Sequence, residues 1–175
     1  VGVKHILERP IHTIENNFLS AQAVLNAASR YGTKVILTST ASIYGHSEQL
    51  PYTETDRYWM GPTSKSRWGY AMSKAVNELL ALAYHRERDL PVVVVRPFNT
   101  IGPRQTHAYG HVVPTFIEQA LRDEPLTIYG DGHQRRCFCD VRDLVRAIYT
   151  LAESESAVGE IINVGNDQEV YIKEL

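Results

Sequence analysis

Two residues in the stretch SRWGYAMSKAVNELLALAY have types and a spacing that suit acid–base chemistry. Tyr70 and Lys74 lie four positions apart, so on a helix their side chains rise from the same face. At that distance the ammonium group can lower the pKa of the phenol, which would let the tyrosine act as a general base. In many helices, however, such a tyrosine packs and such a lysine extends along the surface. The pair alone leaves both interpretations open.

The elements that would position this pair are predicted from hydrophobic patterning. Apolar residues at helical spacing predict one helix over residues 11–30 and another from about Ser66 to Arg88. The runs TKVILTST and LPVVVVRPF are short and continuously apolar, as in strands covered on both faces. The rest of the pattern predicts helices at about 112–123 and 140–152, and strands in LTIYGDG, QRRCFCDV and GEIINVG. Alternating strands and helices predict an α/β fold with a parallel sheet.

Ligands of such sheets bind at the carboxyl ends of the strands. This rule places TST (38–40) and RPFN (96–99) at the edge of a site, with Tyr70 at the start of the helix between them. Thr40 could hydrogen-bond the same substrate oxygen as Tyr70 and help relay its proton. Together the two hydroxyls would deprotonate a carbinol while a nicotinamide accepts the hydride.

Two further sets of residues have chemistry that the sequence leaves open. Four arginines on loops or strand ends could bind phosphates, although each could equally be a surface charge: Arg96, Arg104, Arg135 and Arg136. On a strand, Arg135 would point away from the face that Arg136 occupies. Cys137 and Cys139, two positions apart in one predicted strand, are expected on one face as small core residues rather than as metal ligands.

Composition indicates an ordinary globular protein. The 175 residues are 43% hydrophobic and 22% charged, with a formal net charge of −2. This balance gives no sign of nucleic-acid binding, and no apolar stretch reaches the length of a membrane span. We therefore expect a cytoplasmic protein with no nucleic-acid or membrane partner.

Five motifs, in order, resemble the extended short-chain dehydrogenase/reductase family, which comprises NAD-dependent nucleotide-sugar epimerases, dehydratases and decarboxylases. They are TSTASIYG, YAMSK, RPFNTIGPRQ, YGDGHQRRCF and NVGN. The resemblance implies the C-terminal part of a doubly wound, Rossmann-like domain with a small substrate-binding lobe. Residues 1–99 would form part of the NAD-binding domain, 100–140 mainly the lobe, and 141–175 the return to the first domain together with the start of a truncated C-terminal region. The family's glycine-rich G-x-x-G-x-x-G turn is not found here, and the chain is expected to begin after the family's fourth strand.

The same resemblance implies roles for individual residues. Tyr70 would be the catalytic base, Thr40 its hydroxyl partner and Lys74 the ligand of the cofactor ribose. The implied NAD-binding residues are Ser39, Tyr70, Lys74 and Pro97, and the implied substrate-binding residues are Thr40, Asn99, Arg104, Tyr129 and Arg136. A homodimer through helices 11–30 and 67–88 is also implied.

The reaction depends on position 42. GPTSKSRW and the segment from RRCFCDV to NVGN resemble the UDP-glucuronate decarboxylase branch, which carries an acidic residue two positions after the strand-end threonine. Here that residue is Ser42, in a Thr-Ala-Ser pattern that resembles UDP-glucose 4-epimerases. The sequence therefore favours a 4-epimerase over a decarboxylase. An inactive homologue that serves as a binding or dimerising module is a third alternative.

Overall fold

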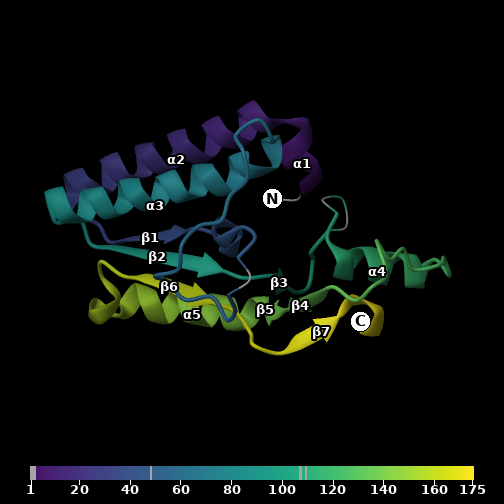
Figure 1. The fold of residues 1–175 in the computed structure, drawn as a ribbon. Coiled ribbons are helices and arrows are strands. Elements are labelled where there is room, and N and C mark those ends of the chain that lie inside the picture. Colours follow the sequence, from purple (N-terminus) through teal and green to yellow (C-terminus); the bar gives the residue numbers. More distant parts are fainter. Residues whose placement is uncertain (1–2, 48, 107, 109) are drawn as a thin grey trace.

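A three-stranded parallel sheet forms the centre of the computed structural model, which describes residues 3–47, 49–106, 108 and 110–175. Its strands are β1 (Val35–Thr38), β2 (Val92–Pro97) and β6 (Ile161–Val164), in the order β1-β2-β6 (Figure 1). Val35 lies opposite Val92, and Val94 lies opposite Ile161. The prediction that the two continuous apolar runs lie side by side in one sheet is confirmed.

Helices cover both faces of this sheet. The pair α2 (Pro10–Tyr31) and α3 (Gly69–Arg88), which run in the same direction, lies on one face, and α5 (Val141–Glu153) lies on the other (Figure 1). Local signals set their ends: a proline opens α2, Gly32 in the left-handed conformation closes it, and the Asp140 carboxylate caps α5 by accepting from the Arg142 amide. A short helix, α1 (Val3–Glu8), precedes α2. The fold is the predicted doubly wound α/β arrangement.

The continuous apolar run of β2 results from its central position, where both of its faces are covered. Val92 and Val94 point into a core formed with Leu25 of α2 and Ala81 of α3. Val93 and Val95 point to the other face, where α5 packs. Because successive side chains alternate, a strand covered on both faces needs an apolar residue at every position.

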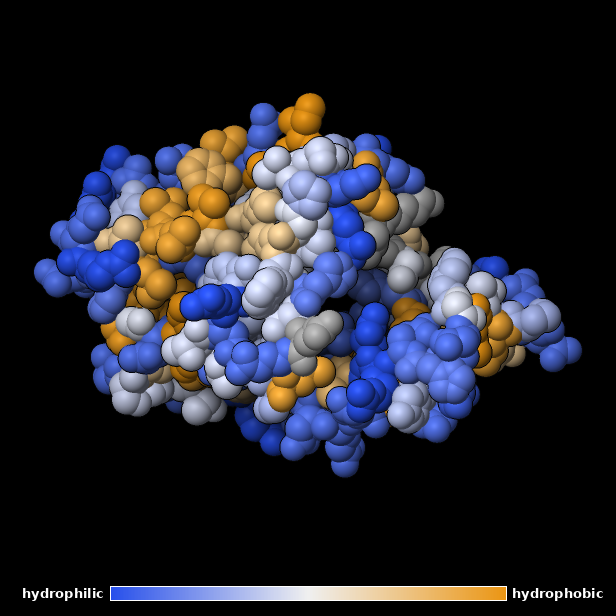
Figure 2. All heavy atoms as spheres, in the orientation of Figure 1, coloured by the Kyte–Doolittle hydropathy of each residue, from blue (hydrophilic) through white to orange (hydrophobic). Residues whose placement is uncertain are grey.

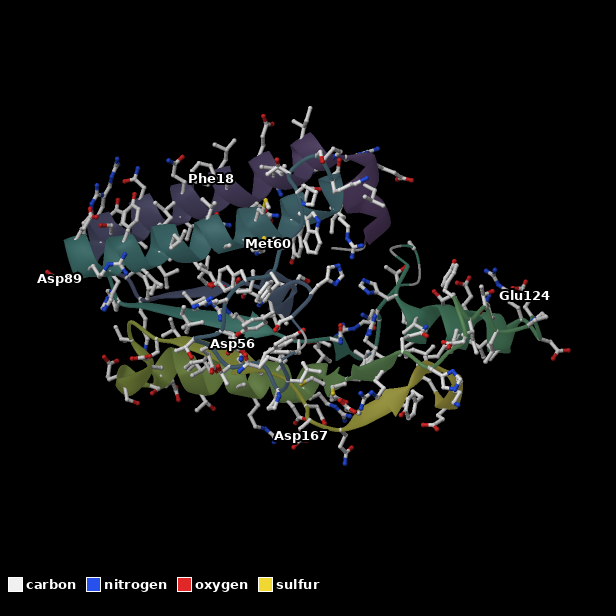
Figure 3. All side chains as sticks on the ribbon, in the orientation of Figure 1. Phe18, Asp56, Met60, Asp89, Glu124 and Asp167 are labelled. Carbon is white, nitrogen blue, oxygen red and sulfur yellow. The ribbon has the colours of Figure 1, made fainter. Side chains whose placement is uncertain are left out.

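Smaller elements lie beyond the carboxyl end of the sheet. β3 (Thr100–Ile101) pairs in parallel with β5 (Cys139–Asp140), and β4 (Arg135–Cys137) pairs antiparallel with β7 (Glu169–Tyr171). α4 (Val112–Leu121) and the segment after it extend outward. Figure 3 shows Glu124 at the end of this extension and Asp89 at the opposite end of the molecule. Four 3₁₀ helices complete the elements described: η1 (Ala41–Tyr44), η2 (Ser66–Trp68), η4 (Glu155–Ala157) and η5 (Ile172–Glu174).

Four predictions about this outer part were wrong. LTIYGDG forms no strand, and β7 follows the strand that was expected to be last. The strand expected in QRRCFCDV is broken at Phe138, because its two halves pair with different partners, β7 and β3. Cys137 and Cys139 consequently do not share a strand face. Cys139 is buried, whereas Cys137 lines a cleft.

None of the described helices combines the length and the apolar character that crossing a membrane requires.

Candidate active site

The carboxyl ends of β1 and β2 open into a cleft of about 1530 Å³. Its inner wall comes from η1, the residues after β2 and the start of α3, and its outer wall comes from β4 and the connection between β6 and β7. The hollow near the middle of Figure 2 lies in this region. Of the predicted site residues, the cleft brings together Thr40, Tyr70, Pro97, Asn99 and Arg136.

Thr40 and Tyr70 meet on the inner wall. Thr40 caps η1: its hydroxyl oxygen accepts from the Ser42 amide at 3.1 Å, and its hydroxyl donates to the Ser42 Oγ at 3.2 Å. Burial raises the pKa of the Tyr70 phenol, and a hydrogen bond with the Thr40 side chain opposes this shift. The net shift is upward, with burial as the larger influence, and the lowering expected from Lys74 stays a prediction. Without ligands, Tyr70 holds its proton at neutral pH.

Lys74 faces a different space. Its ammonium donates to the Thr38 carbonyl oxygen at 2.7 Å, and burial lowers its pKa. It lines a hollow of about 280 Å³ that runs along β1 beside α2. Ser39 lies between Thr38 of this hollow and Thr40 of the cleft, and its buried hydroxyl has no hydrogen-bond partner within the described part of the chain. Tyr70 and Lys74 therefore stand at the boundary of two neighbouring spaces.

The outer wall carries the arginines of β4. Arg136 lines the cleft, with its guanidinium donating to the Arg135 carbonyl oxygen at 2.8 Å. Arg135 lines the same cleft and forms an ion pair with Glu169. Arg135 was predicted to lie on the face away from the site, but both arginines of β4 (Arg135–Cys137) line the cleft. Asn99 joins this wall to the inner one, donating to the Cys137 carbonyl oxygen at 3.2 Å.

Two predicted substrate-binding residues lie away from the cleft. Arg104 is exposed in the turn after β3, and Tyr129, which is 84% exposed, lies in the segment after α4. Neither lines the cleft in this structure. Their assigned contacts with substrate remain predictions.

Arg96 was the one candidate phosphate ligand that the structure excludes. Its side chain is fully buried and pairs with Glu78, with the Nε and one terminal nitrogen donating to the two carboxylate oxygens at 3.0 and 2.7 Å. The remaining donors reach the hydroxyls of Tyr44 and Tyr58 and the carbonyl oxygen of Glu54. All five N–H groups of the guanidinium are therefore used. The sequence left Arg96 open as a phosphate ligand or a surface charge, and it is neither, because its side chain is buried in an ion pair.

This network fixes the inner wall of the cleft. Tyr44, the last residue of η1, donates to the Asn163 side-chain oxygen at 2.8 Å, and the Asn163 side chain in turn donates to the Tyr52 carbonyl oxygen. The Tyr44 and Tyr52 rings stack with centroids 4.6 Å apart. Gly45 then brings the chain against residue 59: its φ is +68°, and a Cβ there would lie 1.9 Å from the Trp59 carbonyl oxygen. Only glycine allows this approach.

Sequence reasoning missed several residues that line the cleft. They are His46, Arg67, Trp68, Asn163 and Asp167. Arg67 and Trp68 lie three and two positions before Tyr70, and this proximity was the available signal. Asn163 belongs to the NVGN motif, whose position at the end of β6 could have placed it by the carboxyl-end rule.

The sequence matches the sequence model of the NAD dependent epimerase/dehydratase family over residues 1–165. The chain belongs to this family. UDP-N-acetyl-alpha-D-glucosaminuronate decarboxylase of Bacillus cytotoxicus is 43% identical over 176 residues, which cover 100% of the chain and 54% of that protein. The chain thus spans about half the length of this relative.

Solved epimerase structures have the same fold. UDP-N-acetylglucosamine 4-epimerase from Methanobrevibacter ruminantium M1, in complex with UDP-N-acetylmuramic acid, superposes with a TM-score of 0.89 and 31% identity, covering 99% of this chain and 54% of that one. UDP-glucuronic acid 4-epimerase from Bacillus cereus, in complex with UDP-glucuronic acid and NAD, gives a TM-score of 0.81 and 32% identity, covering 92% and 49%. The expected family and fold are confirmed.

The family is NAD-dependent, and the residues at the boundary of the two spaces fit the ribose and nicotinamide part of that cofactor. The Lys74 ammonium uses one of its three donors on Thr38, which leaves two for ribose hydroxyls. The unpaired, buried Ser39 hydroxyl beside it provides a further polar group. Among the described residues, no three His, Cys, Asp or Glu side chains are grouped so that they could hold a metal ion.

Proposed function

We propose that the protein carrying this chain is a nucleotide-sugar 4-epimerase that acts on a UDP-sugar. The observation that carries the proposal is the contact between Tyr70 and Thr40 in the cleft, with Ser42 rather than a carboxylate beside Thr40. Epimerisation at C4 requires removal of the C4 hydroxyl proton, loss of the C4 hydride and return of both. It needs one base with a hydroxyl partner and no second acid–base group.

The residues of the chain have defined tasks in this reaction. Tyr70 acts as the phenolate: its oxygen accepts the proton of the C4 hydroxyl and so becomes the neutral phenol, and the Thr40 hydroxyl orients the Tyr70 oxygen. When bound, NAD supplies the acceptor and then the donor for the C4 hydride. Lys74 and Ser39 hold the ribose side of the cofactor. Arg136 faces the phosphates of the substrate from the outer wall, and Asn99 faces them from the segment after β2. Tyr70 returns the proton after the keto-sugar has turned its other face toward the hydride.

The position of the cleft carboxylates supports this choice. The acidic residues that line the cleft within the described chain are Asp167 and Glu169, both on the outer wall, and Glu169 is paired with Arg135. Thr40 and Tyr70 meet on the inner wall. The polar side chains of η1 and of its capping residue there are hydroxyls, and none of them is a carboxylate. A reaction that needs a carboxylate next to the C4 and C5 atoms of the sugar lacks that group here.

Decarboxylation of a UDP-hexuronate is the second candidate. The 43% identity to a decarboxylase favours it, as does the ease with which a β-keto acid loses carbon dioxide once C4 is oxidised. Tyr70 and Thr40 would perform the same oxidation. The two candidates therefore differ only after the keto-sugar has formed.

Product analysis separates the candidates. The protein carrying this chain is incubated with NAD and, in turn, UDP-glucose, UDP-galactose and UDP-glucuronate, and the products are followed by NMR. We expect the C4 epimer of at least one substrate, no carbon dioxide and no net change in NAD. A UDP-pentose from UDP-glucuronate without any C4 epimer would establish the decarboxylase instead.

Absence of turnover with all three substrates would favour the third alternative, an inactive binding or dimerising module. Titration of NAD followed by calorimetry tests this directly, since such a module would bind no NAD.

A further inference from the structure

The Tyr44 hydroxyl lies behind the cleft wall, at the end of η1, and makes two hydrogen bonds. It accepts from a terminal nitrogen of Arg96 at 2.7 Å and donates to the Asn163 side-chain oxygen at 2.8 Å. The residue is completely buried, and this burial raises its pKa. The hydroxyl is therefore neutral, and it joins the end of η1 to the guanidinium of β2 and to the amide of β6.

The Tyr44 ring is held as firmly as its hydroxyl. It stacks on the Tyr52 ring with centroids 4.6 Å apart and meets the Tyr58 ring edge-to-face at 6.4 Å. The guanidinium carbon of Arg96 lies 5.1 Å from the centre of the ring. A substitution that removes only the hydroxyl would keep these ring contacts.

The charged and titratable groups that face Tyr44 are Arg96 of β2 together with Glu54 and Tyr58 of the loop after η1. Arg96 is paired with Glu78 of α3 and also donates to the Glu54 carbonyl oxygen at 3.0 Å. The Glu54 carboxylate accepts from a backbone amide of β6 at 2.8 Å. Because each charge has a partner other than Tyr44, loss of the Tyr44 hydroxyl would leave neither charge unpaired.

η1 connects this buried anchor to the catalytic hydroxyls. It is a single 3₁₀ turn that begins after its capping residue, Thr40, and ends at Tyr44. The Thr40 hydroxyl oxygen accepts from the Ser42 amide within the turn, and the Thr40 side chain also has a hydrogen bond with Tyr70 of α3. Since one turn moves as a unit, a displacement of its Tyr44 end changes the place of the Thr40 hydroxyl relative to Tyr70.

We propose that Tyr44 is a positioning residue, whose hydroxyl holds η1 so that the Thr40 hydroxyl stays in contact with the Tyr70 oxygen. Tyr44 does not line the cleft, and it acts through Thr40. The inference rests on the proposed function, because it takes Tyr70 as the base. It applies to epimerisation and to decarboxylation alike, since both begin with oxidation at C4.

The first test is the pH–rate profile of Tyr44→Phe in the protein carrying this chain. The rate rises with pH as Tyr70 loses its proton. This limb should move to higher pH by about half a unit to one unit, which corresponds to the loss of one hydrogen bond. Above the limb, kcat should stay close to the wild-type value, because Tyr70 itself is intact. A loss of folded protein would instead lower the rate at every pH.

A double variant shows whether the effect passes through Thr40. Thr40→Val removes the hydroxyl that Tyr44 positions, so Tyr44→Phe should add no shift in the Thr40→Val background. Tyr58→Phe is the matched control, because Tyr58 donates to Glu78 and accepts from Arg96 in the same buried network but lies outside η1. It should lower the free energy of unfolding in urea, as Tyr44→Phe does, and leave the limb in place.

Direct titration of Tyr70 makes the failure of this inference distinguishable from failure of the proposed function. Ultraviolet difference titration of each variant against the same variant with Tyr70→Phe reports the ionisation of Tyr70 without turnover. A shift to higher pH in Tyr44→Phe that disappears in the Thr40→Val background would support the inference even in a protein that converts no UDP-sugar. If Tyr44→Phe does not fold, Asn163→Ala, which removes the acceptor of the Tyr44 hydroxyl, takes its place with the same expected results.

Four results would overturn the inference: no shift, a shift to lower pH, an equal shift in Tyr58→Phe, or an undiminished shift in the Thr40→Val background. Formation of a C4 epimer together with any of these would leave the proposed function standing alone.

Discussion

Tyr70 is subject to two opposing influences, and their balance determines its protonation. Burial in the cleft wall favours the neutral phenol, whereas the hydrogen bond with Thr40 favours the phenolate. In the chain as described, burial prevails. A functional tyrosine base therefore depends on the Thr40 hydroxyl for the part of its activation that the chain itself provides.

Tyr70→Phe should reduce turnover by about 10²- to 10⁴-fold, the usual contribution of a general acid–base group, and leave NAD affinity nearly unchanged. The measurements are kcat on the substrate found by NMR and NAD binding by calorimetry. Tyr84→Phe, near the other end of α3 where Arg88 lies over the ring, is the matched control and should retain full activity. Near wild-type turnover in Tyr70→Phe would remove Tyr70 from the mechanism.

In the pH–rate profile, the rate should rise with pH as Tyr70 loses its proton. Thr40→Val should shift this rising limb to higher pH. The direction follows because the hydrogen bond between the Thr40 and Tyr70 side chains lowers the Tyr70 pKa, so its loss raises that pKa and a higher pH is needed to form the phenolate. Thr40→Ser retains the hydroxyl and should keep the limb in place. A limb that moves to lower pH, or not at all, in Thr40→Val would contradict the role assigned to Thr40.

Arg136→Ala should raise KM by about 10- to 100-fold with a smaller effect on kcat, because a phosphate contact acts in the ground and transition states alike. Arg135→Ala should raise KM less, since Arg135 is already paired with Glu169. Steady-state kinetics with the UDP-sugar substrate measures both. Equal increases in KM for the two variants would show that Arg135 binds the substrate despite its ion pair with Glu169.

At the scale of the elements, strongly periodic segments could be predicted from sequence and short paired ones could not. The helix over 11–30 is marked by apolar residues at helical spacing, because one of its faces is buried. The strand VVVV is marked by an unbroken apolar run, because both of its faces are buried. β4 and β5 are two or three residues long and exist through pairing with β7 and β3. A contact between segments so far apart leaves no local period in the sequence.

In the site, too, residues with a local sequence signal could be predicted, and residues whose role depends on a distant partner could not. Thr40, Tyr70 and Asn99 were located by the carboxyl-end rule together with motif resemblance, and the cleft brings them together. The buried pairing of Arg96 was not among the alternatives that the sequence offered, because its partner, Glu78, is distant in sequence and approaches it only when α3 packs on β2. Tertiary pairing decides whether a strand-end arginine is a ligand or a structural residue.

Glu78→Gln should destabilise the fold by about 3–5 kcal/mol, because it leaves the buried Arg96 charge without its counter-ion. Urea unfolding followed by circular dichroism measures this, and Glu87→Gln at the exposed end of the same helix is the matched control, with little expected change. The double variant Glu78→Leu/Arg96→Met, which removes both charges, should lose less than Glu78→Gln. A change below about 1 kcal/mol in Glu78→Gln would show that the pair is not a structural anchor.

At the scale of the whole molecule, the outer surface of α2 and α3 carries large apolar side chains. Ile14, Leu19 and Val24 of α2 are 43%, 56% and 57% exposed, and Val76 and Leu79 of α3 are 45% and 65% exposed. Figure 2 shows hydrophobic atoms gathered over these two helices. An apolar area of this kind is typical of an interaction surface. We propose that it pairs with the same surface of a second copy, as the resemblance to the family implies.

Leu79→Glu should convert the dimer to a monomer, because a two-fold interface places the same residue on both copies and so buries the new charge twice. Size-exclusion chromatography with light scattering on the protein carrying this chain measures the mass. Val145→Glu, at a residue 59% exposed on α5 across the sheet, introduces the same charge on a surface outside the proposed interface and should leave the dimer intact. A monomeric wild type, or a dimer that persists in Leu79→Glu but dissociates in Val145→Glu, would move the interface away from α2 and α3. Because the start of α3 also carries Tyr70, loss of activity that accompanies dissociation would show that the dimer supports the catalytic helix from its outer side.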